Sequence, residues 1–376
     1  MSRGTILYVG NFELPDKGAS ANRVMSNRKL FQSLGYRVVM LGVVHEDFSG
    51  IRASDYQEDI FEEACPSSTK AWAEHMFSTK NMDALVRKYK DVKMILLYNA
   101  PYALYRRCYR QFHKRNIKVC YDCTEWTTVT DGNIIKRLMK KWDGGLIRKR
   151  LGKKTDGLIV ISSLMANAYQ KVDNLLLLPP LVDVTDPIWH QTPKHCPEKF
   201  EFCFAGMLDG NKDSLDRIVE AFARLDSEKA TLRIIGVTKE DFLTYYPDSG
   251  KYLRESVLFM GKQSHEKTLY YLCGCYCYIF VRQSDLRNNA GFPTKFAEAY
   301  TSGKPLITTN ISDICQYLRT SSKGIVLEDM MTSTISNAME EMMKHREQRQ
   351  SDELEQAFHY LSYAPETKRW LEGIME

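Results

Sequence analysis

Apolar and polar positions in the first half of the chain follow two alternating periods. Continuous apolar runs predict buried strands at residues 5–12, 36–44, 93–100, 117–123 and 155–162. Between them, segments such as 21–35 and 101–116 repeat their apolar residues at helical spacing. A strand, a glycine-containing loop, a helix and another strand make a βαβ unit, so this half is predicted to form a parallel sheet.

The second half of the chain repeats the same order of elements. A helix is predicted at 215–225, and strands are predicted at 200–208, 230–237, 257–262, 276–281 and 305–309. We therefore expect an α/β protein of two Rossmann-like domains, residues 1–182 and 200–361, joined by a linker at 183–199. Ligands of such sheets bind at the carboxyl ends of the strands, which predicts a site in a cleft that both domains face.

Composition and cysteine usage indicate a soluble protein of the cytoplasm. No stretch approaches the roughly 20 apolar residues that span a bilayer, and "MSRGTILYVG" runs into a strand without a secretory signal. The ten cysteines are scattered, which indicates reduced thiols. Cys120 and Cys123 form a CxxC motif without a second pair, so a metal or redox site is disfavoured. Cys273, Cys275 and Cys277 lie in an apolar run and are expected to be buried.

Charge is divided unevenly between the two halves. Residues 1–180 hold 29 Lys and Arg against 18 Asp and Glu, a charge of +11, and residues 181–376 carry −6, which together give the chain's +5. Nine of the basic residues lie in 133–154, among apolar residues at helical spacing. This pattern predicts contact with an anionic membrane, and an ordinary amphipathic helix packed on the core is the alternative. Nucleic acid is disfavoured because no binding motif accompanies the charge.

The segment "NNAGFPTKFAEAYTSGKPLITT", residues 288–309, carries the clearest candidate chemistry. Its pattern predicts a loop, a helix that begins at Pro293 or Thr294, a turn at Gly303 and a short strand. Lys295 and Glu298 are then three residues apart on one helical face. A lysine at a helix start suits a phosphate and a carboxylate suits sugar hydroxyls, although a solvated ion pair would give the same spacing.

Four segments in order resemble the family 4 glycosyltransferases of the GT-B fold over nearly the whole chain. "ILYVGNFELPDKGASANRV" is similar to the family's first strand and glycine loop, with Gly18 in the loop. "TDGLIVISSLMANAY" with "LLLLPPLVD" is similar to the end of its first domain. "FCFAGMLDGNKDSLDRIVEAF" resembles the start of its donor domain, and 288–309 resembles its nucleotide-sugar motif. The resemblance also implies that a C-terminal helix, about 362–376, returns to the first domain.

The resemblance assigns residues to the nucleotide and its diphosphate. Lys295 and Lys212 would hold the diphosphate, Glu298 would bind the ribose hydroxyls, and Gly236 and Gly261 would line the base at strand ends. Gly206, at the end of the donor-domain strand, is also assigned to the donor. Fixed lysines and helix N-termini stabilise a phosphoryl leaving group without a bound metal. The sequence contains no D-x-D motif, and we expect neither a cofactor nor a metal.

The sequence departs from the family pattern where the donor-domain strand ends. Met207 follows Gly206, at a position where an arginine is usual. Either the lysines carry the phosphates alone, or Arg282 or Arg287 compensates.

A second departure concerns the sugar of the donor. Ala290 stands where the common motif has a first glutamate, eight residues before Glu298. Asn289 or Asn288 is therefore the expected sugar contact. Backbone N–H groups around Gly291 and Phe292 would face the sugar and the β-phosphate.

The acceptor side is assigned to the first domain. The resemblance makes Asp122 and Glu125 candidates for holding an acceptor or sugar hydroxyl, and a turn aspartate with a helix-starting glutamate is the alternative. The family also implies retention of anomeric configuration. No conventional general base is assigned, since the leaving phosphate can take the acceptor proton.

These features predict a glycosyltransferase that moves a sugar from a nucleotide diphosphate sugar to a carbohydrate acceptor. The expected acceptor is lipid-linked, in the assembly of capsule, O-antigen or exopolysaccharide, and the expected location is the cytoplasm, peripheral at the inner face of the cell membrane. A non-hydrolysing nucleotide-sugar epimerase shares the architecture and is one alternative. A non-catalytic GT-B binding subunit is the other.

Overall fold

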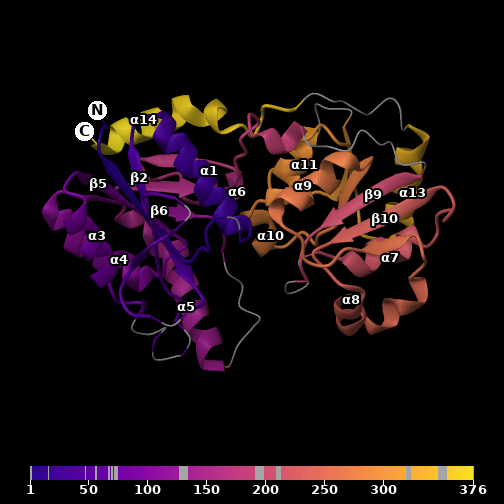
Figure 1. Ribbon diagram of the computed structural model, residues 1–376, viewed down its shortest axis with the longest axis horizontal. Coiled ribbons are helices and arrows are strands. Elements are labelled where there is room, and N and C mark those ends of the chain that lie inside the picture. Colours follow the sequence, from indigo (N-terminus) through magenta and orange to yellow (C-terminus); the bar gives the residue numbers. More distant parts are fainter. Residues whose placement is uncertain are drawn as a thin grey trace. The chain divides into compact units, whose positions relative to one another are not determined.

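The chain forms two compact units, each built on its own sheet. The computed structural model describes residues 2–15, 17–46, 48–55, 57–66, 68, 71, 75–126, 134–190, 199–208, 213–318, 323–345 and 354–375. The first unit comprises Met1–Leu181 and Tyr360–Glu376, and the second comprises Val182–His359. Each unit is a sheet covered by helices (Figure 1), as predicted for an α/β protein.

The sheet of the first unit has eight strands in the order β3-β4-β2-β1-β5-β6-β7-β8. All neighbours are parallel except β3 and β4. The strands are β1 (Thr5–Gly10), β2 (Arg37–Val44), β3 (Arg52–Ala53), β4 (Ile60–Ala64), β5 (Val92–Tyr98), β6 (Lys118–Cys123), β7 (Gly157–Val160) and β8 (Leu175–Leu177). The strand order reverses between β1 and β5, which is where ligands of parallel sheets bind.

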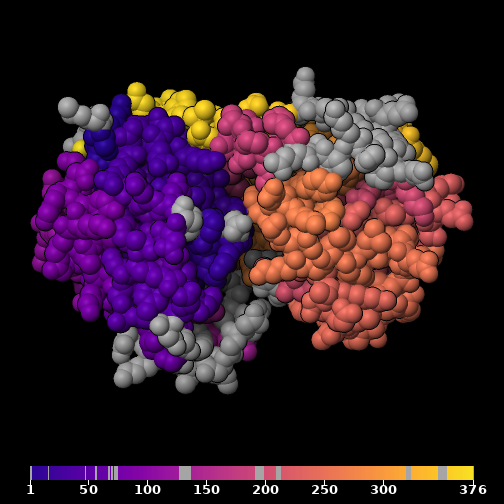
Figure 2. Space-filling model, in the orientation of Figure 1, coloured from indigo at the N-terminus to yellow at the C-terminus, as the bar shows by residue number. Residues whose placement is uncertain are grey.

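The helices of the first unit follow the amphipathic segments of the sequence. They are α1 (Ala19–Ser33), α3 (Lys80–Lys88), α4 (Tyr102–Phe112), α5 (Ile134–Arg150), α6 (Ser163–Ala168) and α14 (Ala364–Met375). In the space-filling view α14 appears in yellow along the margin of the indigo part of this unit (Figure 2). No helix among the described residues is both long enough and apolar enough to cross a membrane.

The C-terminal helix α14 is part of the first unit's core. Trp370, Leu371 and Ile374 are at most 5% exposed and belong to the same apolar cluster as Ile6 of β1. The indole N–H of Trp370 donates a hydrogen bond of 3.0 Å to the carbonyl of Asn174. The apolar face of the C-terminal segment therefore packs where the sequence predicted it.

The sheet of the second unit has six parallel strands in the order β11-β10-β9-β12-β13-β14. The strands are β9 (Phe200–Ala205), β10 (Ala230–Ile235), β11 (Val257–Phe259), β12 (Cys277–Phe280), β13 (Leu306–Thr309) and β14 (Gly324–Leu327). The helices are α7 (Leu215–Phe222), α8 (Lys239–Tyr245), α9 (His265–Gly274), α10 (Leu286–Ala290), α11 (Thr294–Thr301), α12 (Ile314–Leu318) and α13 (Thr332–Lys344).

Two segments of the second unit differ from the sequence prediction. Part of the expected linker is ordered structure, because Trp189 of a 3-10 turn, Pro187–His190, is only 5% exposed and donates to the carbonyl of Asp183 at 2.7 Å. The expected loop before α11 is partly helical. Asp285 caps α10 by accepting from the N–H of Asn288 at 2.7 Å, a cap that the prediction missed.

Candidate functional site

Helix α11 begins at the carboxyl edge of the second sheet, as the sequence predicted. Pro293 precedes the helix and provides no side-chain cap. The N–H of Phe296 donates to the carbonyl of Pro293 at 3.0 Å, whereas the N–H groups of Thr294 and Lys295 have no carbonyl one turn earlier in the helix to bond. Phe296, Ala297 and Tyr300 are buried and anchor the helix on the core. Gly303 ends it with a positive φ of 72°, which glycine adopts readily.

Three charged or titratable side chains meet on the first turn of α11. The carboxylate of Glu298, only 2% exposed, accepts from Lys295 Nζ at 2.6 Å through Oε2. Its Oε1 lies 3.0 Å from Nε2 of His265, the first residue of α9. Burial raises the pKa of Glu298, but the charge of Lys295 and the hydrogen bond from His265 outweigh it and lower the pKa to about 2. The carboxylate is therefore ionised and accepts hydrogen bonds only.

Three predicted glycines lie at the same edge of the sheet, directly after strands β9, β10 and β11. Gly236 has a φ of 97°, and a Cβ there would lie 2.2 Å from the carbonyl oxygen of Gly206. Its N–H donates to the carbonyl of Gly261 at 2.8 Å. A larger residue at 236 would push these backbones apart, so glycine there allows the strand ends to approach closely and to bond.

The other positions expected at the phosphates differ in their surroundings. Arg282 follows β12, and its guanidinium is held by both carboxylate oxygens of Asp213, with the longer contact at 3.1 Å. Arg282 is thus paired with a buried carboxylate, as Lys295 is with Glu298, and its compensation for the arginine replaced by Met207 stays a prediction. Met207 itself is 64% exposed. Lys212 lies outside the described residues.

The segment before α11 is held by contacts within the protein. The side chain of Asn289 accepts from the N–H of Ser312 at 2.9 Å. The N–H of Gly291 donates to the carbonyl of Arg287 at 3.1 Å, which contradicts its predicted role as a donor to the sugar. The ring of Phe292 is 7% exposed and packs against Phe296, Tyr317 and Phe358.

The two residues that flank Asn289 in the sequence, Asn288 and Ala290, are buried. The Nδ2 of Asn288 donates to the carbonyl of Gln283 at 2.9 Å. Asn289, which is half-buried, therefore remains the better placed of the two asparagines for a sugar contact.

The structure corrects the assignment of Asp122 to the acceptor. Asp122 is 0% exposed, and its two oxygens accept from Arg23 at 2.8 and 3.1 Å. The hydroxyl of Tyr8 and the amide of Asn27 also bind it. A carboxylate with this surrounding is a buried structural partner and cannot meet a sugar hydroxyl.

The other two residues predicted for the first unit lie on its surface. Glu125 is exposed and follows the carboxyl end of β6. Gly18 precedes α1 with a φ of 104°, and a Cβ there would meet no atom of the described residues within 4 Å. The predicted glycine loop therefore starts a helix in an open position, as a ligand-facing loop requires.

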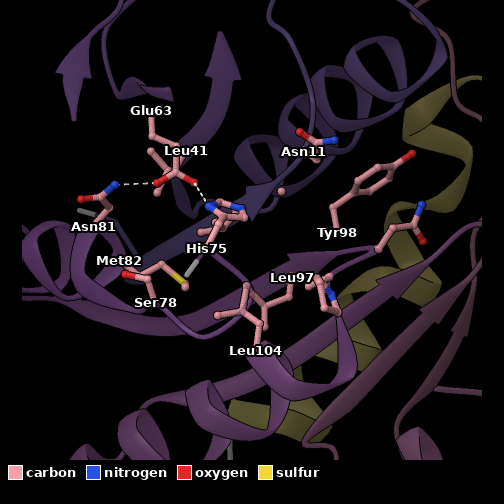
Figure 3. Close-up of a pocket in the computed structure, with 15 residues that line it drawn as sticks. Asn11, Leu41, Glu63, His75, Ser78, Asn81, Met82, Leu97, Tyr98 and Leu104 are labelled. Carbon is pink, nitrogen blue, oxygen red and sulfur yellow. Dashed lines mark hydrogen bonds and ion pairs between the residues drawn. The ribbon is translucent and has the colours of Figure 1, made fainter. Parts of the chain in front are cut away.

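A cavity of about 90 Å³ opens at the carboxyl edge of the first sheet, between the ends of β1 and β5 (Figure 3). Glu63 accepts from Asn81 Nδ2 at 2.6 Å, and its other oxygen lies 3.7 Å from Nδ1 of His75. Tyr98 and Asn11 lie across the cavity from this group. Burial raises the pKa of Tyr98 to about 12, so its phenol stays protonated at neutral pH.

The sequence did not identify this group. Strand β4, which carries Glu63, reads "IFEEA" and lacks the apolar run that predicted its neighbours. Asn81 and His75 are 18 and 12 positions away from Glu63, and no local motif connects them.

Cys273, Cys275 and Cys277 are buried, as predicted, and Cys120 and Cys123 are buried too. None of these five cysteines is in a disulfide. Burial raises the pKa of the Cys120 thiol well above its usual value, which makes it unreactive. The described part of the chain shows no group of three His, Cys, Asp or Glu side chains placed to hold a metal ion.

The sequence of the second unit identifies a family. Residues 186–354 match the family model described as glycosyl transferases group 1. The matched residues make up less than half of the chain and lie within the second unit. No curated protein sequence matches the chain significantly.

Solved structures with the same fold cover nearly the whole chain. Sucrose-phosphate synthase from Thermosynechococcus elongatus aligns with a TM-score of 0.71 and 13% identity over 98% of this chain and 98% of that one. Anabaena HepE in complex with UDP and glucose aligns with a TM-score of 0.65 and 12% identity over 98% and 100%. WaaG, a glycosyltransferase involved in lipopolysaccharide biosynthesis, aligns with a TM-score of 0.62 and 12% identity over 98% and 94%.

At these identities the structural likeness establishes the fold alone. The predicted GT-B architecture of two Rossmann-like domains is confirmed. The group 1 match of the second unit supports the predicted enzyme class, a nucleotide-sugar-dependent glycosyltransferase.

Proposed function

We propose that the chain transfers a sugar from a nucleotide diphosphate sugar to a carbohydrate acceptor, with the donor on the second unit. The observation that carries this proposal is the Lys295–Glu298 pair on the first turn of α11, at the carboxyl edge of a parallel sheet. The side chain of Lys295 is 28% exposed, so its ammonium reaches solvent while its partner stays buried. The group 1 match covers the same segment and supports the assignment.

The donor residues have separate roles in this proposal. Lys295 and the N–H groups of Thr294 and Lys295 at the start of α11 bind the diphosphate, because both present positive charge to an anion. Glu298 accepts hydrogen bonds from the ribose hydroxyls, since its oxygens retain further lone pairs. The glycine margin at Gly236 and Gly261 leaves room for the base. This distribution of charge stabilises the leaving phosphate, and the proposal assigns no metal.

The proposed reaction retains the anomeric configuration, as in family 4. The bond between the sugar's anomeric carbon and the phosphate oxygen breaks, and the acceptor oxygen bonds to that carbon from the same face. The acceptor proton passes to the leaving phosphate oxygen, so no protein base is required. The preorganised positive charge at Lys295 lowers the energy of the departing diphosphate.

We place the acceptor sugar in the cavity of the first unit. Its polar lining combines a carboxylate, an amide and an imidazole at Glu63, Asn81 and His75, which together donate to and accept from hydroxyl groups. The cavity of about 90 Å³ is large enough to hold several waters, which part of a sugar ring would displace. Exposed Glu125 lies at the same edge and is a further acceptor contact.

Helix α5 supports an acceptor held at a membrane. None of its described side chains from 137 to 150 is buried, and Trp142 and Leu138 are 68% and 62% exposed. Its other side contacts the first unit, where Asp143 accepts from the N–H of Tyr102 at 2.9 Å, so an amphipathic helix packed on the core stays the alternative. Exposed basic residues flank Trp142, including Lys140 and Lys141. An apolar strip with flanking cations suits an anionic bilayer, where a lipid-linked saccharide would be found.

The relatives guide the choice of substrates. HepE was solved with UDP and glucose, and WaaG is described as acting in lipopolysaccharide biosynthesis. These titles support UDP sugars as the first donors to test and a surface polysaccharide, such as capsule, O-antigen or exopolysaccharide, as the product.

A panel of nucleotide sugars tests the proposed function. The purified chain is incubated with UDP, GDP, ADP and dTDP sugars, with and without a lipid-linked saccharide mixture, and products are separated by mass spectrometry. The proposal predicts release of one nucleoside diphosphate that increases when acceptor is added. Interconversion of two donor sugars without acceptor would identify an epimerase, and donor binding without turnover would identify a binding subunit.

A further inference from the structure

We propose that His265 is a positioning residue that holds Glu298 ready for the ribose when Lys295 engages the diphosphate. This inference rests on the proposed function of the second unit. It adds a residue from α9 to a donor site otherwise assigned to α11 and the loops at the strand ends.

The two oxygens of Glu298 have different partners. Oε2 is bound by Lys295 at 2.6 Å, and Oε1 is bound by His265 at 3.0 Å. Lys295 lies on the same helical turn, whereas His265 comes from another helix, 33 residues earlier. Both partners are about a quarter exposed, with side-chain exposures of 28% and 27%, while the side chain of Glu298 is 3% exposed.

Donor binding should weaken the Lys295–Glu298 contact more than the His265–Glu298 contact. Lys295 is the second residue of α11, and a diphosphate at the start of that helix shares its ammonium with Glu298. An ammonium has three N–H donors, so Lys295 keeps a contact with the carboxylate as it turns toward the phosphate, but it no longer fixes the direction of that carboxylate. His265 comes from a separate helix and keeps its hydrogen bond to Oε1. His265 therefore keeps Glu298 aimed at the ribose while Lys295 binds the diphosphate.

The protonation of the pair follows from the carboxylate. Glu298 is ionised at neutral pH and can only accept, so Nε2 of His265 carries the hydrogen. The backbone of His265 is fixed as the first residue of α9, after Ser264, whose hydroxyl accepts from the N–H of Lys267 at 3.2 Å. The imidazole thus approaches Glu298 from a rigid element, which a positioning residue requires.

A matched set of variants and ligands separates positioning from mere stabilisation. UDP, GDP and ADP are titrated calorimetrically into the parent protein, and the tightest binder is carried forward together with its 2′,3′-dideoxy form. The variants are His265→Phe, which removes the donor, and His265→Gln, whose amide nitrogen reaches a position near Nε2. His345→Gln, at an exposed histidine that follows α13 in the same unit, is the control.

We expect His265→Phe to weaken binding of the ribonucleotide about 10- to 100-fold, the range of a charge-assisted hydrogen bond. His265→Gln should recover most of that loss. The dideoxy ligand lacks the hydroxyls that Glu298 binds, so its affinity should be similar in the parent and in His265→Phe. His345→Gln should match the parent with both ligands.

Other results would overturn the inference in distinguishable ways. Equal ribonucleotide affinity in the parent and His265→Phe would show that His265 does not position Glu298. Equal losses for the ribonucleotide and the dideoxy ligand would show that the histidine only stabilises the fold around α9 and α11. If the parent binds no nucleoside diphosphate, the proposed donor site is wrong and this inference is rejected with it.

Discussion

Asp122 in the first unit and Glu298 in the second are both buried carboxylates paired with a cation. The contacts are similar in length, 2.8 Å from Arg23 to Asp122 and 2.6 Å from Lys295 to Glu298. The sequence treated both as candidate site residues. Their surroundings show that one supports the fold and the other can meet a ligand.

The difference lies in the partners. The side chain of Arg23 is 2% exposed and also donates to the carbonyls of Leu178 and Pro179, so the Asp122 pair is closed on all sides. Lys295 and His265 reach solvent at the edge of the sheet. A buried carboxylate therefore indicates a binding site when the cations that hold it are accessible, and a structural pair when they are not.

The largest expected effect is on the closed pair. Asp122→Asn leaves Arg23 buried without its counter-charge and should lower the free energy of unfolding by about 3–5 kcal/mol. Urea denaturation measures this loss. The matched control is Glu125→Gln, which is exposed and should stay within about 0.5 kcal/mol of the parent. A stable Asp122→Asn variant that has lost only acceptor turnover would return Asp122 to the site.

Low pH should weaken the pair of Lys295 and Glu298, which is called the open pair because its cation reaches solvent. The pKa of Glu298 is lowered from 4.5 to about 2 in the folded protein, so its contribution to stability is present above about pH 4.5 and is lost as the pH falls toward 2. Compared with Glu298→Gln, the parent should lose about 2–3 kcal/mol of unfolding free energy over that interval. Denaturation curves between pH 6 and pH 2.5 measure it. A difference between the two proteins that does not change with pH would contradict the lowered pKa.

Nucleotide binding should depend on both members of the open pair. Lys295→Ala removes a charge-assisted contact to the diphosphate and should weaken nucleoside diphosphate binding by about 1.5–3 kcal/mol. Glu298→Ala should cost a similar amount, equally for every sugar on the same nucleotide. Lys344→Ala, an exposed lysine of α13, serves as the control in calorimetric titrations. Unchanged binding in both variants would remove these residues from the donor site.

The smallest effect per residue concerns helix α5 of the basic half. Each lysine or arginine near an anionic surface contributes about 1 kcal/mol, within a Debye length of roughly 8–10 Å. Vesicle sedimentation should show binding that requires anionic lipid, weakens in high salt and is lost when Lys140, Lys141, Arg148 and Lys149 become glutamine.

The control for the vesicle experiment changes four exposed lysines of the second unit to glutamine, namely Lys239, Lys251, Lys267 and Lys344. This variant should sediment like the parent with anionic vesicles. Equal pelleting with neutral vesicles, or none with either, would indicate a soluble acceptor.

The sequence predicted the sheets and the start of α11 because those features depend on local patterns. Strands such as β5 are buried on both faces and read as apolar runs, and Pro293 and Gly303 mark the ends of α11. The contacts that decide function are not local. Arg23 meets Asp122 across 99 positions, and His265 meets Glu298 across 33. No spacing rule connects such residues, so the first pair was misassigned and His265 was missed.

The central claim is that the first turn of α11 binds the donor's nucleotide. A crystal structure of the chain with a bound nucleoside diphosphate tests it most directly. The account predicts a phosphate oxygen about 2.7–2.9 Å from Lys295 Nζ and the ribose hydroxyls within hydrogen-bond distance of the Glu298 carboxylate, with His265 still on its other oxygen. A nucleotide bound elsewhere, with the Lys295–Glu298 pair unchanged and without contact to it, would contradict the account.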